Sequence, residues 1–206
     1  MKQDQLHLRL FGTTDIHGFY LNFDYYNDQV VDKMGLISLE RVLREAQNEL
    51  THPENSLLFD NGDLLQGSPL ADYMRDYADT FEHPAYTLMN KMGYDAATLG
   101  NHEFNFGVPF LLRMLKQAEF PYVNANIVKE SGEPLLPPYV ILERTFITEK
   151  GRSLPFKIGV IGILPPQITK WDRAHLESYA KEHERLTTLD AMESVQAYLP
   201  EIKAAG

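Results

Sequence analysis

The apolar positions of this chain follow two spacings that alternate along its length. Short apolar runs predict β-strands, and apolar residues three or four positions apart predict amphipathic α-helices. The predicted strands cover residues 6–13, 56–59, 96–99, 120–125, 137–146 and 156–164. The predicted helices cover residues 35–50, 68–76, 84–92, 108–118 and 189–205, and residues 20–31 are predicted to form an aromatic and polar loop. Strands that alternate with helices indicate an α/β layered fold, in which ligand sites gather at the carboxyl ends of the strands.

Proline and glycine support the limits of three predicted helices. Pro69 and Pro109 stand near helix starts, where the missing N–H of proline is tolerated. Gly93 directly follows the helix predicted at residues 84–92. Glycine is common at this position because it readily adopts the left-handed conformation that ends a helix.

Three clusters of polar residues lie where predicted strands end. They are Thr14-Asp15-Ile16-His17, Asp60-Asn61-Gly62-Asp63 and Gly100-Asn101-His102-Glu103. Carboxylate, imidazole and amide groups are the ligands that divalent metal ions take from a protein without thiolates. The ordered series at strand ends therefore predicts a metal site.

Each cluster offers a distinct kind of ligand. Asp15 and His17 are two residues apart, so on a continuing strand their side chains point to the same side and share an ion. Asp63 has two carboxylate oxygens, which allows it to bridge two ions, and Asn101 offers a neutral amide oxygen. His102 is better placed to donate a proton to a leaving oxygen than to bind the same ion as its neighbour.

The polar clusters also have non-functional explanations, and Asp-x-His by itself is a common pattern that usually carries no function. Asp60 or Asp63 can cap the segment that follows it, and Gly100-Asn101 is a common turn dipeptide. A single histidine such as His102 is more often a hydrogen-bonded surface residue than a catalytic one. The metal-site prediction depends on three such clusters occurring in order, each at a strand end.

Composition narrows the chemistry. The 206 residues contain no cysteine, which excludes disulfides, a cysteine nucleophile and thiolate metal sites. The formal net charge of −10 argues against binding of polymeric nucleic acid. A small anionic substrate stays compatible with this charge, because two divalent ions would reverse the local field. No apolar run is long enough to span a bilayer.

The polar clusters and longer strings around them resemble one protein family. The strings that carry the resemblance are residues 15–17, 23–26, 60–74, 100–107, 121–126 and 165–168. They are similar to the bacterial bifunctional 2',3'-cyclic-nucleotide 2'-phosphodiesterase/3'-nucleotidase family, in the 5'-nucleotidase group of the calcineurin-like metallophosphoesterases. The resemblance implies a four-layer α/β/β/α sandwich with two divalent metal ions, whether Mn, Zn, Fe, Mg or Co.

The resemblance also implies a role for each matching residue. Asp15 and His17 would bind the first ion, Asp63 would bridge both ions and Asn101 would bind the second. His102 would stabilise the transition state and protonate the leaving group. The implied activity is metal-assisted hydrolysis of small nucleotides, above all 2',3'-cyclic nucleotides and 3'-nucleotides. The alternatives are a 5'-nucleotidase or UDP-sugar hydrolase, or a non-catalytic fragment; oligomeric state is left open.

Two departures from the family pattern shape the prediction. Many 5'-nucleotidases have an aspartate that orients the catalytic histidine where this chain has Asn105, and an amide cannot stabilise a protonated imidazole by charge. The superfamily also uses three later histidines, two of them in a Gly-His-x-His motif that is absent here. We therefore expect residues 1–206 to be the N-terminal part of one metallophosphoesterase domain, without the nucleoside-binding C-terminal domain and weakly active or inactive alone. The resemblance implies a periplasmic or cell-surface parent protein, and from the residues before the first strand we expect no signal peptide within this chain.

Overall fold

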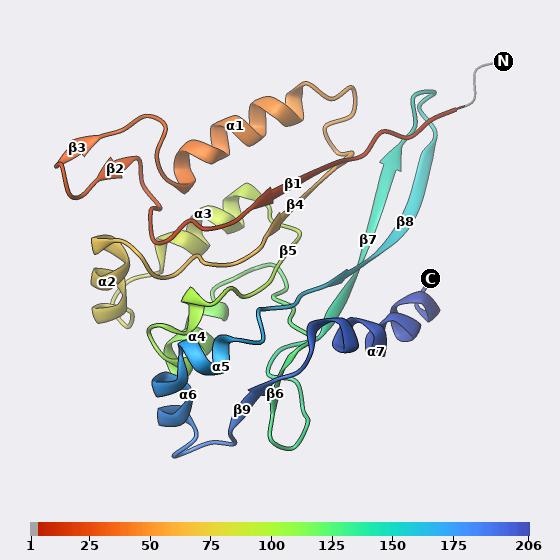
Figure 1. Cartoon of the computed structure of the whole chain (residues 1–206). Helices are drawn as coiled ribbons and strands as arrows, with labels where there is room; N and C mark the ends of the chain where they lie inside the picture. Colours follow the sequence, from red (N-terminus) through yellow and green to blue (C-terminus); the bar gives the residue numbers. More distant parts are fainter. Residues whose placement is uncertain (1–3) are drawn as a thin grey trace.

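A three-stranded parallel sheet forms the part of the structure from which the polar clusters project. The computed structural model describes residues 4–206. Strand β1 (Arg9–Thr13) pairs with β4 (Ser56–Asp60), which pairs with β5 (Ala96–Ala97), and all three run towards α2 (Pro69–Asp76) in Figure 1. The register places Thr13 beside Asp60 at the end of the β1–β4 ladder. Since the strands are parallel, the three loops that follow them leave from the same edge of the sheet.

The helices of the first half begin within one residue of the predicted positions, and those predicted at residues 35–50 and 108–118 end two and three residues earlier than predicted. Helix α2 has Pro69 in its first turn, and the Ser68 hydroxyl accepts the Ala71 N–H as an N-cap. Helix α3 (Pro84–Met92) also begins at proline, and it ends at Gly93 with a φ of 73°. The remaining elements of this half are α1 (Leu36–Asn48), the 3-10 turn η1 (His102–Phe104) and α4 (Val108–Leu115).

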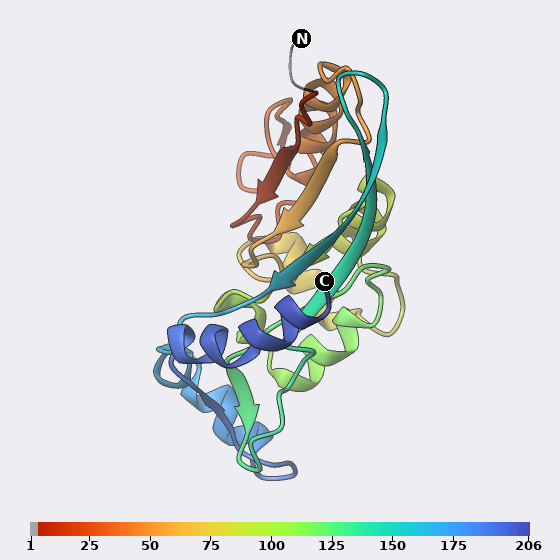
Figure 2. The same cartoon turned by 90° about the vertical axis from the view of Figure 1, so that its right-hand side faces the viewer.

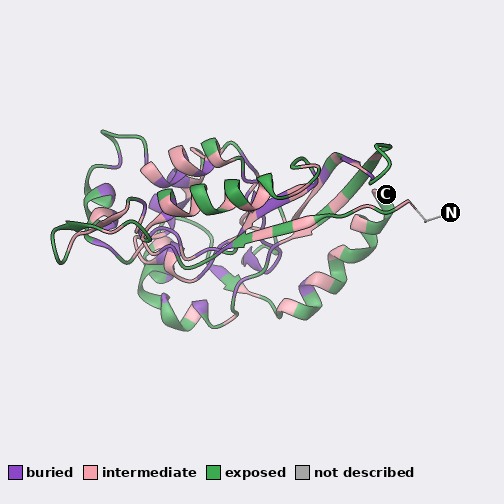
Figure 3. Ribbon diagram, turned by 90° about the horizontal axis from the view of Figure 1, so that it is seen from above, coloured by how far each residue is buried: buried purple, intermediate pink, exposed green. Residues whose placement is uncertain are grey.

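A long antiparallel hairpin dominates the second half. Strands β7 (Tyr139–Ile147) and β8 (Ser153–Ile161) pair along their whole length, and α7 (Ala191–Ala204) lies across them (Figure 2). Gly159 permits this approach, because a Cβ there would lie 2.3 Å from the side chain of Ile202. Residues of β8 and α7 are mostly half-buried or exposed (Figure 3). The two strands predicted at residues 137–146 and 156–164 and the helix predicted at residues 189–205 are confirmed, although the observed elements begin and end one to three residues away from the predicted limits.

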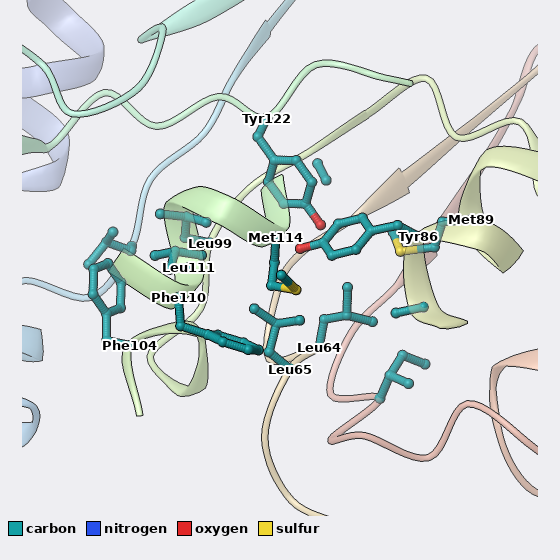
Figure 4. Packing of buried hydrophobic residues seen from close by; sticks show 14 of the residues in the cluster. Leu64, Leu65, Tyr86, Met89, Leu99, Phe104, Phe110, Leu111, Met114 and Tyr122 are labelled. Carbon is teal, nitrogen blue, oxygen red and sulfur yellow. The ribbon is translucent and has the colours of Figure 1, made fainter. Parts of the chain in front are cut away.

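The main hydrophobic core lies directly behind the loops at the sheet edge. Leu64, Leu65, Leu99 and Phe104 are each at most 1% exposed, and they pack with residues of α3 and α4 (Figure 4). These four residues stand within three positions of the candidate site residues of the last two clusters. Burial of an apolar side chain of this size contributes about 1.5–3 kcal/mol to folding stability. Each of these side chains therefore stabilises the position of its loop against the core.

The strand predicted at residues 120–125 is wrong. Only Tyr122 forms a bridge, with Ala97, and the strand β6 begins later, at Ile127–Lys129. The buried Asn124 side chain accepts the backbone N–H groups of Asn126 and Ile127 and so turns the chain. This local hydrogen bonding ends the ladder after one bridge.

Several short elements were not predicted. The aromatic loop contains a hairpin of two short strands, β2 (Phe23–Asp24) and β3 (Gln29–Val30). Its turn is held by the Asp24 carboxylate, which accepts backbone N–H groups. Later in the chain are α5 (Ile168–Trp171), α6 (Arg173–Tyr179) and β9 (Leu186–Thr188), which pairs with β6. Elements of two to seven residues have too few positions to show a hydrophobic period. Among the described residues, no helix is long and apolar enough to cross a membrane.

Candidate metal centre

Three side chains from the three polar clusters converge at the edge of the sheet. His17, Asp63 and His102 each offer one ligand atom, and these atoms all lie within 4.8 Å of one another. The two imidazole rings meet edge to face with centroids 4.7 Å apart. Within the part of the chain that the structure describes, this is the one group of three histidine and acidic side chains with such spacing. The structure thus brings together residues that lie far apart in the sequence.

The loops after β1 and β4 are joined by backbone hydrogen bonds. Asp15 N–H donates to the Gly62 carbonyl at 3.1 Å, and His17 N–H donates to the Asp63 carbonyl at 2.9 Å. These bonds continue the parallel pairing beyond the strands and fix the spacing of the first two clusters.

The local geometry differs from the strand alternation that we used to predict the Asp15–His17 pair. Asp15, His17 and Asp63 have φ values of 55°, 49° and 57°, so they lie in the left-handed region rather than on a continuing strand. A non-glycine residue in this region is uncommon and is often found at a functional site. The pair was predicted correctly as neighbours, because His17 Nε2 lies 3.4 Å from Asp15 Oδ1, but the backbone reason given for it was wrong.

The His17 ring is held so that one nitrogen is free to bind an ion. Its Nδ1 lies 3.0 Å from the Gln66 carbonyl, which accepts only, so Nδ1 carries a proton and Nε2 is the nitrogen on the side of Asp15. Nearby, the Thr14 hydroxyl donates to Asp15 at 2.6 Å. This hydrogen bond, followed by contact with His17, lowers the pKa of Asp15 and keeps its carboxylate ionised.

Asp63 and Asn101 also keep ligand atoms available. Oδ1 of Asp63 accepts the backbone N–H of His102 at 2.8 Å, which leaves Oδ2 for another partner. Asn101 stands at the start of η1. Its side-chain amide makes no hydrogen bond to any described residue, so it stays available as a neutral oxygen ligand.

Glu103 organises this site, although no role was predicted for it. Its carboxylate is 2% exposed and accepts four backbone hydrogen bonds. Oε2 accepts from Asp63 at 2.8 Å and Gly100 at 2.5 Å, and Oε1 accepts from Leu64 at 2.6 Å and Leu65 at 3.3 Å. Burial raises the pKa of Glu103, and the backbone N–H groups oppose that rise. One buried carboxylate therefore ties the second cluster to the third.

Asp60 serves the fold beneath the site. It is 2% exposed, accepts the Thr13 hydroxyl at 2.6 Å and accepts the Gly62 N–H at 3.0 Å. Burial raises the pKa of Asp60 to about 7. The structural alternative considered for this residue, that it caps the following segment, agrees with its bond to Gly62.

His102 contacts Asn105 as the family pattern implies. Nδ1 of His102 lies 2.7 Å from Oδ1 of Asn105, and Nδ2 of Asn105 donates to Asp172 at 2.6 Å. Asp172 is 4% exposed and was not predicted, since it lies 67 residues further along the chain in a segment with no strand signal. Burial raises the pKa of Asp172, and its bond from Asn105 opposes that rise.

The donor set fits a divalent ion. Oxygen and imidazole ligands on preformed loops suit Mn, Fe, Zn, Co or Mg, and one ligand nitrogen is already oriented by a second contact. The convergence of two histidines and a carboxylate at one point is the structural observation behind this assignment. The residues present therefore fit a metal-dependent hydrolytic site.

Comparison with known proteins gives matches over nearly the whole chain. Residues 8–195 match the family described as calcineurin-like phosphoesterase. The chain is 43% identical over 202 residues to the 2',3'-cyclic-nucleotide 2'-phosphodiesterase/3'-nucleotidase of Haemophilus influenzae, covering 97% of this chain and 29% of that relative. It is 42% identical over 208 residues to the trifunctional nucleotide phosphoesterase protein YfkN of Bacillus subtilis, covering 98% of this chain and 14% of that protein. The chain thus spans less than a third of these relatives.

A solved structure agrees with the fold. The crystal structure of the calcineurin-like phosphoesterase YfkN from Bacillus subtilis superposes with a TM-score of 0.89 at 42% identity, covering 98% of this chain and 60% of that one. A putative 5'-nucleotidase from Staphylococcus aureus superposes with a TM-score of 0.75 at 30% identity, covering 96% of this chain and 35% of that one. These superpositions confirm the predicted α/β fold class.

Proposed function

The chain belongs to the calcineurin-like phosphoesterase family, and from that premise we propose that it forms part of an enzyme that hydrolyses phosphate esters of nucleotides. The observation that carries the proposal is the convergence of His17, Asp63 and His102 within 4.8 Å. The substrates we propose for the whole protein are 2',3'-cyclic nucleotides and 3'-nucleotides. The name of the Haemophilus influenzae relative, which matches 97% of this chain, supports this choice. The name of the Bacillus subtilis relative, which matches 98% of this chain, supports the broader class of nucleotide phosphoesterases.

Four residues would hold a pair of divalent ions. Asp15 and His17 would bind the first ion, Asp63 would be shared by both ions and Asn101 would bind the second ion. When bound, such ions act as Lewis acids on the phosphate ester and neutralise charge that develops on it. The ionised Asp15 and the oriented His17 Nε2 prepare the first position before any ion arrives.

His102 would handle the proton of the leaving group. Its Nδ1 is engaged by Asn105, so Nε2 is the nitrogen left to exchange a proton with the departing oxygen. The backbone N–H of His102 donates to Asp63, which links the position of this ring to the proposed bridging carboxylate.

The runner-up function is that of a 5'-nucleotidase. Less similar relatives include the 5'-nucleotidase of Vibrio cholerae, which is 32% identical over 79% of this chain. Both functions use the same phosphate chemistry and differ in the ester bond that is positioned for attack. Export of the parent protein to the periplasm or cell surface stays a prediction from the family resemblance.

Hydrolysis by the full-length protein tests the proposal. We expect turnover of 2',3'-cyclic AMP and 3'-AMP that exceeds turnover of 5'-AMP, that EDTA abolishes and that Mn²⁺ restores. Asp63→Ala should remove at least roughly 99% of the activity, because the loss of a bridging ligand affects both ions. Asp79→Ala is the matched control, since it removes an exposed carboxylate that pairs with Arg113 on the surface.

Two outcomes would contradict the proposal. Near-normal turnover by Asp63→Ala would exclude the assigned bridge. A strong preference for 5'-AMP would favour the 5'-nucleotidase instead.

For residues 1–206 alone we propose weak metal binding, because the family assigns further histidines to this centre. Calorimetry with Mn²⁺ tests this, and submicromolar binding of two ions would contradict it.

A further inference from the structure

Asp172 belongs to a partly buried hydrogen-bonded series that ends on the imidazole of His102. The series runs from His102 Nδ1 to Asn105 Oδ1 at 2.7 Å, and from Asn105 Nδ2 to Asp172 Oδ1 at 2.6 Å. It connects η1 with the junction between α5 and α6, two parts of the chain 67 residues apart.

The chemistry of the three groups allows one arrangement of protons. An ionised carboxylate only accepts hydrogen bonds, so the amide NH₂ of Asn105 must face Asp172. The amide oxygen then faces His102, and this oxygen also only accepts. Nδ1 of His102 must therefore carry a proton, and Nε2 is the ring nitrogen that this series leaves unengaged.

The position of Asp172 does not depend on its side chain. Its backbone N–H donates to Ile168 at 2.9 Å, and its carbonyl accepts from His175 and Leu176 at 3.0 Å each. Ile168 and Leu176 are buried at 0% and 6% exposure, and they anchor the helices on both sides. Asp172 occupies the N-cap position of α6 but makes no side-chain cap hydrogen bond, so its carboxylate is free to serve Asn105.

We propose that Asp172 is a positioning residue that orients the Asn105 amide and so fixes the Nδ1–H tautomer of His102. The role of that tautomer in turnover rests on the proposed function, in which Nε2 exchanges a proton with the leaving group. The tautomer itself is a property of the metal-free protein. Outer partners that orient a functional imidazole are typically worth about 10- to 100-fold.

The first measurement is the ¹⁵N spectrum of the His102 imidazole in the metal-free protein, at a pH where the ring is neutral. The wild type should show a predominant Nδ1–H tautomer. Asp172→Ala should move the population towards the Nε2–H form, because the Asn105 amide is then free to flip. An unchanged tautomer population in Asp172→Ala, with the fold intact, would overturn the proposal.

A reciprocal exchange supplies the second measurement. Asn105→Asp places a second carboxylate beside Asp172, so no donor lies between them. Adding Asp172→Asn supplies an amide NH₂ at position 172 that donates to the new carboxylate, and that carboxylate accepts from Nδ1 of His102. We therefore expect Asp172→Asn to raise kcat when Asn105→Asp is already present. In the wild-type background it should instead lower kcat, with KM within about twofold. The expected loss in Asp172→Ala is about tenfold in kcat.

The sign reversal separates positioning from a structural role. A side chain needed only for folding would cause the same loss in both backgrounds, and that result would overturn the proposal. Asp190→Asn is the matched control, since Asp190 holds the same N-cap position in α7 but bonds to Met192 and Glu193 of its own helix. If wild-type protein hydrolysed no nucleotide ester but Asp172→Ala still showed the tautomer shift, the proposed function would fail and the positioning role would stand.

Discussion

Gly100→Ala offers a sharp test of how closely the second and third clusters approach each other. A Cβ at Gly100 would lie 2.2 Å from Asp63 Oδ1 and 2.7 Å from Asp63 N. The φ of Gly100 is not in the left-handed region, so alanine adds steric conflict without backbone strain. The substitution therefore acts on the Asp63 carboxylate itself.

The size of the effect follows from the distances. Ordinary contact begins near 3.4 Å, so the Asp63 carboxylate or its loop must move by roughly 1 Å. Overpacking of this kind costs about 1–3 kcal/mol of stability. Metal–ligand distances tolerate only about 0.2 Å, and we expect Mn²⁺ affinity to fall at least tenfold, equivalent to about 1.4 kcal/mol.

Gly12→Ala is the matched control. Gly12 lies in β1 of the same sheet, and a Cβ there would have only Asn61 Nδ2 within 4 Å, at 3.8 Å. Calorimetric titration of both full-length variants with Mn²⁺, together with thermal unfolding, measures the two effects. If folded Gly100→Ala bound Mn²⁺ within about twofold of wild type, Asp63 would not be a ligand at the position that the structure gives it.

Two further predictions concern the buried carboxylates. Glu103→Gln should lower the free energy of unfolding, measured in urea, by about 1–3 kcal/mol, because the new amide NH₂ faces backbone N–H groups that lose their acceptor. Glu45→Gln, at an exposed position, is the control. Equal stability of the two variants would contradict this role of Glu103. For Asp60, the folded-state pKa of about 7 lies above the ordinary value of 3.8, so its contribution to stability is complete below that ordinary value and is lost as the pH rises to about 7. The stability of the metal-free wild type relative to Asp60→Asn should fall across that window by on the order of 1 kcal/mol per pH unit and then level off. A pH-independent difference between the two proteins would refute this.

Local features of the fold were predictable because neighbouring residues encode them. Helix α3 begins at Pro84 and ends at Gly93 as predicted, since proline suits a first turn and glycine suits a left-handed end. The failure at residues 120–125 has a local cause as well, because the buried Asn124 side chain competes for backbone N–H groups. An apolar pattern alone does not reveal whether such an asparagine turns inward.

The candidate site divides in the same way. The order of the clusters at strand ends predicts that Asp15, His17, Asp63 and His102 lie near one another, because parallel strands bring their carboxyl ends to one edge. The left-handed backbone at three of these positions was not predictable, since it is imposed by hydrogen bonds between two loops.

The sequence by itself determined the kinds of side chain at the candidate site, their order and the α/β framework that carries them. Only the tertiary structure decided how they are held: Glu103 joins two loops through four backbone N–H groups, and Asp172 reaches the His102 ring through Asn105. The physical reason is that periodicity and capping act between neighbours in the chain. A buried carboxylate instead takes its role from whichever donors the completed fold places around it, at any separation in sequence.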